Sequence, residues 1–233
     1  MSDNPDPSPF NALPPQVWFL FAAIALPELA FSLGEAGMVG GPQAIGWRLE
    51  ALNTYAFSGQ AFDFMVQNGI ILWDHMLRFV TYPFVSGSFT STLIGGVIVL
   101  AMGKLVGEAL GGWAVWLLFL LCSIIGALVM GLLTSQSWLA GPYPGGYGLI
   151  GAFTFLYWQK QVATGGPQTQ AFLLIGVLMG LQLVFAALSG LAGQTASYRW
   201  VAELSGAAAG FGLVAFVVPG GMARLLAALR QRR

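Results

Sequence analysis

The chain has 233 residues, of which 57% are hydrophobic and 8% are charged. A soluble domain carries about 25% charged residues, so this composition excludes an ordinary soluble protein and predicts an integral membrane protein. The formal net charge is zero, which gives no support for nucleic-acid binding. The single cysteine, Cys122, excludes a disulfide framework or a cysteine zinc site within one chain, and we expect it to be a small buried hydrophobic residue. We expect no cofactor and no metal.

The N-terminal residues 1–15 are acidic and rich in proline and lack the basic region of a signal peptide. They predict a short disordered leader. Residues 16–219 are expected to form one membrane domain, and residues 220–233 a basic tail. With no targeting peptide, a compact chain of this kind fits a bacterial inner membrane.

Apolar windows predict six membrane helices, in chain order at about 16–33, 86–106, 112–133, 146–159, 171–192 and 199–219. Five approach the roughly 20 residues that cross a bilayer. The fourth window is short, and a proline- and glycine-rich segment, 141–146, precedes it. We therefore expect a short fourth helix and an irregular segment that enters the membrane beside it, which requires cover from protein or a wet cavity.

Six spans place both termini on one side of the membrane. Six of the nine lysines and arginines then fall on the side of the termini, which predicts cytoplasmic termini by the positive-inside rule. The first external loop, about 34–77, mixes aromatic residues with a few charges. This mixture favours a segment that is partly embedded in the membrane interface, with an ordinary loop packed on the helix ends as the alternative.

Glu203 is an acidic residue inside the last apolar segment. A carboxylate within a membrane helix costs about 2.5–3.5 kcal/mol on insertion scales, so it is a functional candidate. Gly206 and Gly210 follow on nearly the same helical face and, with Gly145 and Gly146 in the fourth segment, predict close helix packing. Glu28, in the first apolar segment, is a second such acid, but no motif accompanies it.

Four stretches in the second half of the chain carry a family resemblance: LRFVTYPFVSGSF (77–89), GKLVGEALG (103–111), GPYPGGYG (141–148) and ELSGAAAG (203–210). Over about residues 76–215 they resemble, in order and spacing, the motifs of the rhomboid family of intramembrane serine proteases. The third is similar to the nucleophile motif G-x-S-G that opens a short fourth helix in that family. The fourth is similar to H-x-x-G-x-x-x-G on the sixth helix. The resemblance implies an all-α bundle of six transmembrane helices.

The departures from the family pattern fall on its catalytic residues. The serine position holds Tyr147 or, if the register is taken from the preceding Gly-Pro, Gly148. The histidine position holds Glu203, and the pair H-x-x-x-N that resembles an oxyanion site reads Ser91 and Gly95. Acyl transfer needs a nucleophile, a base and oxyanion donors. Losing all of them together predicts a member without catalysis, a pseudoprotease.

Glu203 then has a structural interpretation. Arg199 lies one turn earlier on the same helix face and could pair with it, and Tyr147 could donate a hydrogen bond to it. The alternative has Arg199 extending to the outer interface and Glu203 hydrated by cavity water. The only histidine, His75, is expected to be an interfacial polar residue beside Asp74.

The leading functional hypothesis is a non-catalytic rhomboid that binds transmembrane segments of client or partner proteins, as an adaptor or quality-control factor. One alternative is an intramembrane peptidase with altered active-site residues. A small transporter or channel is the third hypothesis, although the sequence has no inverted repeat and no second interrupted helix. The expected partners are transmembrane proteins and the lipid bilayer.

Overall fold

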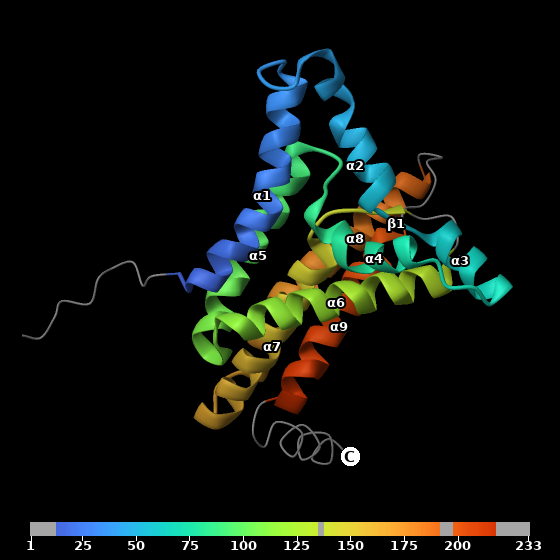
Figure 1. Cartoon of the computed structure of the whole chain (residues 1–233). Coiled ribbons are helices and arrows are strands. Elements are labelled where there is room, and N and C mark those ends of the chain that lie inside the picture. Colours follow the sequence, from blue (N-terminus) through green and yellow to red (C-terminus); the bar gives the residue numbers. More distant parts are fainter. Residues whose placement is uncertain (1–12, 135–137, 192–197, 218–233) are drawn as a thin grey trace, which may run out of the picture.

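Six long helices of the computed structural model coincide with the six apolar segments (Figure 1). The structure describes residues 13–134, 138–191 and 198–217. The six are α1 (Pro15–Glu35), α5 (Phe89–Leu110), α6 (Gly112–Leu133), α7 (Tyr143–Thr164), α8 (Leu173–Leu191) and α9 (Arg199–Val217). Most of the predicted leader and the whole predicted tail lie outside the described residues.

Three of these helices, α1, α5 and α6, are long and apolar enough to cross a membrane, within the part of the chain that the structure describes. They contain 21, 22 and 22 residues, which at 1.5 Å per residue is about 30 Å, the thickness of the hydrocarbon core. The predicted integral membrane protein is therefore supported by its helices. That α7, α8 and α9 also cross the bilayer stays a prediction.

The predicted short fourth helix is wrong. α7 runs over 22 residues, from Tyr143 to Thr164, so its length matches the longest helices of the molecule. Its first turn includes Pro144, because proline is tolerated where the backbone N–H has no helical partner. The helix also continues through polar residues after 159 and ends at Gly165, which has a φ of 69°. The apolar window missed both ends.

The segment between α1 and α5 is largely helical rather than a loop. It contains η1 (Gly41–Gly46), α2 (Trp47–Tyr55), β1 (Phe57–Ser58), α3 (Gly59–Asn68), α4 (Trp73–Thr81) and η2 (Tyr82–Phe84). β1 pairs antiparallel with β2 (Trp138–Leu139), with Phe57 opposite Leu139. This short pair ties the segment between α1 and α5 to the connection between α6 and α7.

The core is centred on α7, which packs against α5, α6 and α9. Figure 1 shows α6 crossing the other helices, with α1 beside α5 and α7 beside α9. Fully buried side chains fill the contact, among them Phe119 on α6 and Phe155 on α7. Cys122 on α6 is buried, as predicted. Between α7 and α8, η3 (Gln168–Phe172) leads from one helix into the next.

Candidate functional site

The contact between α7 and α9 depends on glycine. A side chain at Gly206 would overlap the backbone carbonyl of Pro144, and one at Gly210 would overlap the carbonyl of Gly148. Gly151, one turn further along α7, meets the backbone of α9 in the same way. The two backbones therefore touch along two helical turns, which lets dispersion contacts accumulate without side chains between the helices.

The other glycines of α7 face its remaining neighbours. Gly145 lies against Phe119 and the hydroxyl of Ser123 on α6. Gly146 faces Ile98 on α5, where an added Cβ would be 3.2 Å from the side chain. α7 thus presents small residues to three helices at once, and this fixes the position of its first turns.

The first turn of α7 meets the first turns of α5 through polar contacts. The Tyr143 hydroxyl donates to the backbone carbonyl of Ser91 at 3.0 Å, and the Ser91 hydroxyl donates to the Tyr143 oxygen at 3.3 Å. Pro142 packs so closely on Gly95 that an added Cβ would be 2.5 Å from its ring. The structure therefore brings Ser91 and Gly95 to the start of α7. The residue that contacts Ser91 there is Tyr143, which was not singled out from the sequence.

Glu203 and Tyr147 are both buried, with 6% and 5% of their surfaces exposed. The carboxylate is close enough to act electrostatically on the Tyr147 phenol and on Tyr82 in η2. Tyr82 is fully buried and donates to the Ser123 carbonyl at 2.8 Å. Burial raises the pKa of the Tyr82 phenol, and the negative charge of Glu203 adds to that shift. The Tyr82 phenol therefore stays protonated and keeps its hydrogen bond to the Ser123 carbonyl.

Arg199 lies at the exposed start of α9. Its guanidinium donates to the Ala140 carbonyl at 3.0 Å and lies 5.8 Å from the centre of the Tyr143 ring. Both contacts tie α9 to the turn that precedes α7. Arg199 therefore helps to hold the start of α7 against α9.

Sequence reasoning missed a second polar centre, built on Arg48. This arginine lies on α2 and reaches α1, where it donates to both carboxylate oxygens of Glu28 at 2.7 and 2.8 Å. Its Nε donates to Glu35 at 2.7 Å. The Arg48 and Glu28 side chains are 11% and 5% exposed. We call this set of three charged residues the Arg48 clamp.

Neutral groups also form hydrogen bonds with members of the Arg48 clamp. The hydroxyls of Thr92 on α5 and Ser32 on α1 donate to Glu28 at 2.7 and 2.9 Å. Arg48 also donates to the backbone carbonyl of Ser86 at 3.3 Å. Hydrogen bonds to the two carboxylates raise the pKa of the Arg48 guanidinium above its already high ordinary value. The clamp therefore stays ionised and fastens α2 to both α1 and α5.

A groove of about 440 Å³ lies beside the Arg48 clamp, between α1 and α5. Its walls are apolar, with Phe21 and Leu26 from α1 and Leu93 from α5 among them. Glu28, a member of the Arg48 clamp, and Thr92, which donates a hydrogen bond to Glu28, also line the groove. The groove thus offers an apolar surface with a polar patch at one point.

The single histidine, His75, lies on α4, outside the contact of α5, α7 and α9. Its Nδ1 is buried without a hydrogen-bond partner among the described residues. Burial lowers the pKa of His75, the positive charge of Arg78 lowers it further, and Asp74 opposes the shift. α7 contains neither serine nor cysteine, and α9 contains no histidine. Within the described residues, the contact of α7 with α9 therefore holds the carboxylate of Glu203 and no imidazole.

Residues 74–220 of the chain match the family model of the Rhomboid domain. The match covers the helices from α4 to α9, and so it includes both Tyr143 and Glu203. No curated protein matches the chain.

Proposed function

This chain belongs to the rhomboid family, and we propose that it is a non-catalytic member that binds transmembrane segments of client or partner proteins. The observation that carries the proposal is the hydrogen-bonded contact of Tyr143 with Ser91, together with the burial of Glu203 on α9. In our interpretation of the motifs, these residues replace the nucleophile, the oxyanion group and the base of a family protease.

The register of the nucleophile motif supports this interpretation. A third register begins G-x-S-G at Gly141 and puts Tyr143, rather than Tyr147 or Gly148, at the serine position, with Pro144 in place of the last glycine. We favour this register because Tyr143 opens α7. It also contacts Ser91, which the motif pattern places in the oxyanion pair. A phenol of ordinary pKa near 10 is a poor peptidase nucleophile. With a carboxylate in place of the imidazole, proton transfer from that phenol at neutral pH is unfavourable.

Client binding is supported by the groove between α1 and α5. Its apolar walls suit a hydrophobic helix, and the carboxylate and hydroxyls of Glu28, Ser32 and Thr92 offer acceptors to a polar group on that helix. We infer that the occupant is a single transmembrane helix with a hydroxyl or amide residue near its middle. Such a residue would find a hydrogen-bond partner in the membrane only at a site of this kind.

We further infer that all six long helices cross the membrane, with both termini in the cytoplasm of a bacterial cell. Glycine-mediated contact between α7 and α9 supports the burial of α7 at the centre of such a bundle. The family match supports the same topology.

Loss of catalysis is tested by labelling with a serine-directed fluorophosphonate, with an active rhomboid protease as positive control. We expect no labelling of the purified protein and no cleavage of a model transmembrane substrate. Labelling, or cleavage that is abolished by Tyr143→Phe, would overturn the non-catalytic assignment.

Client binding is tested by photocrosslinking from position 93 in native membranes, with position 117 on α6 as the control. Leu93 and Leu117 are similarly exposed, at 52% and 58%, but only Leu93 lines the groove. We expect reproducible membrane-protein crosslinks from position 93 alone. Ala25→Phe, which fills the groove, should abolish them, whereas Ala30→Phe on the same helix should not. Equal crosslinking from both positions would contradict the proposed site.

A further inference from the structure

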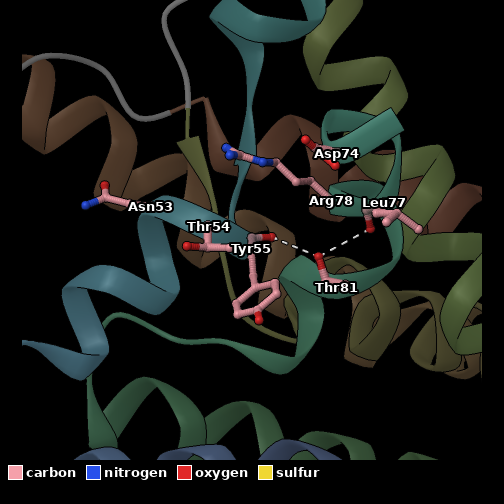
Figure 2. A pocket seen from close by; sticks show the side chains of 7 residues that line it. All are labelled: Asn53, Thr54, Tyr55, Asp74, Leu77, Arg78 and Thr81. Atoms are coloured by element: carbon pink, nitrogen blue, oxygen red, sulfur yellow. Dashed lines mark hydrogen bonds between the residues drawn. The ribbon is translucent and has the colours of Figure 1, made fainter. Parts of the chain in front are cut away.

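A second cavity, of about 350 Å³, lies between α2 and α4 (Figure 2). Residues 53–55, at the end of α2, form one wall, and four residues of α4 form the other: Asp74, Leu77, Arg78 and Thr81. Figure 2 shows the Thr81 hydroxyl between the carbonyls of Tyr55 and Leu77. It donates to these at 3.1 and 3.3 Å, which holds the two walls together.

Two opposite charges line this pocket without neutralising each other. Asp74 and Arg78 are one helical turn apart on α4, a spacing that usually permits a salt bridge. Neither residue makes a salt bridge within the described part of the chain. The guanidinium of Arg78 has a single long hydrogen bond, to the Ala56 carbonyl at 3.5 Å, and its Nε is buried without a partner.

A buried guanidinium N–H without an acceptor lowers the stability of the fold, because its hydrogen bond to water is lost and no protein acceptor replaces it. An anion in the pocket would supply that acceptor. Phosphate oxygens suit the planar, multiple donors of arginine. The opposite wall holds the amide of Asn53 and the hydroxyl of Thr54, which already donates to the Glu50 carbonyl at 2.9 Å.

The surroundings of the pocket are apolar and exposed. On α4, Trp73 and Leu77 are 75% and 61% exposed, and Tyr55 on the other wall is 47% exposed. α4 thus has one strongly apolar face and one face with Asp74 and Arg78, the pattern of a helix that lies in a membrane interface. Tryptophan and tyrosine side chains are typical of that depth. A ligand here would lie between headgroups and acyl chains.

We propose that this pocket binds the headgroup of a membrane phospholipid that carries both a phosphate and a primary amine. The phosphate is bound by Arg78, and the ammonium group by Asp74. The acyl chains extend over Leu77 and the apolar face of α4. The site lies outside the contact of α5, α7 and α9, so it does not depend on whether the protein cleaves peptides or binds clients.

The proposal is tested by native mass spectrometry of the full-length protein in detergent, with added phosphatidylethanolamine or phosphatidylglycerol of matched acyl chains. We expect phosphatidylethanolamine to bind about tenfold more tightly. Arg78→Gln should weaken binding of both lipids about tenfold, because the phosphate contact is common to them. Asp74→Asn should remove only the preference for the amine, so that both lipids bind equally.

Matched controls separate this site from general charge effects. Lys160→Gln removes an exposed cation on α7, and Asp63→Asn removes a partly exposed carboxylate on α3; neither should change lipid binding. Asp74→Asn leaves the Arg78 contact with Ala56 intact, so it reports on the site even if Arg78→Gln folds poorly.

A competition measurement with inorganic phosphate distinguishes a lipid headgroup from a free anion. We expect millimolar phosphate to leave phosphatidylethanolamine bound, since the acyl chains contribute to its affinity. Displacement of the lipid by phosphate would overturn the lipid assignment in favour of a free anion. Equal binding of both lipids by the unmodified protein, or unchanged binding by Arg78→Gln, would overturn the site itself.

Discussion

Two regions of the molecule hold helices together by opposite means. α7 and α9 meet through Gly206 and Gly210, where the absence of side chains lets backbone touch backbone. α1 and α2 meet through the Arg48 clamp, where long charged side chains reach across the space between the helices. The first contact depends on shape and the second on charge compensation.

This difference decides how each region tolerates change. A glycine contact fails when any atom is added, because neither backbone can move without disturbing other helices. A buried ion pair fails when one partner is removed, because the remaining charge has no compensation. Conservative changes therefore damage the two regions in different ways, and the following substitutions are designed to expose that contrast.

The largest effect is expected from Arg48→Met, which replaces the guanidinium with a shorter, uncharged and flexible side chain. Glu28 would remain buried without its main partner, and breaking a buried pair in this way costs about 3–5 kcal/mol. Thermal unfolding in detergent measures the loss.

The double variant Arg48→Met with Glu28→Met should recover much of that stability, since replacing both members of a buried pair with apolar residues is often neutral. Lys160→Met, at an exposed site on α7, serves as the control and should change stability by less than about 0.5 kcal/mol. If Arg48→Met is no more damaging than Lys160→Met, the Arg48 clamp does not stabilise the fold.

Gly210→Ala should destabilise by about 1–3 kcal/mol, the range for adding atoms to a well-packed contact. The new methyl group would overlap the Gly148 carbonyl on α7, so the helices must separate. The matched control is Gly212→Ala, also on α9, where a Cβ would meet nothing within 4 Å. Similar unfolding temperatures for the two variants would contradict backbone contact between α7 and α9.

Tyr82→Phe should cost about 1 kcal/mol, the typical net contribution of one hydrogen bond. It removes the donor to the Ser123 carbonyl while keeping the buried ring. Tyr55→Phe, on a half-exposed tyrosine, is the comparison and should be close to neutral. Chemical unfolding in mixed micelles would resolve the difference, and equal values would show that the buried bond adds nothing.

The smallest effect concerns His75. Because burial lowers its folded-state pKa below the ordinary value of 6.5, protonation is less favourable in the folded protein. Its contribution to stability is therefore complete above pH 6.5 and is lost as the pH falls through the folded-state pKa. His75→Asn should reduce the fall in unfolding temperature between pH 7.5 and 5.5. An unchanged pH profile in this variant would exclude the role of His75.

The sequence by itself determined what depends on local composition. Apolar runs located the six long helices, because a long apolar stretch satisfies its own backbone polar groups when it forms a helix. The spacing of Gly206 and Gly210 placed them on one face, since the helix period fixes which residues are neighbours. The same reasoning failed for α7, because polar residues such as Gln159 and Lys160 extend the helix without being apolar.

Only the tertiary structure decided which distant groups meet. Glu28 was visible as an acid in an apolar run, but its partner Arg48 lies 20 residues away and reaches it only because η1 reverses the chain. Tyr143 likewise meets Ser91 across 52 residues through the packing of α7 on α5. Such contacts depend on where the chain turns and how whole helices pack, and no local period in the sequence encodes them.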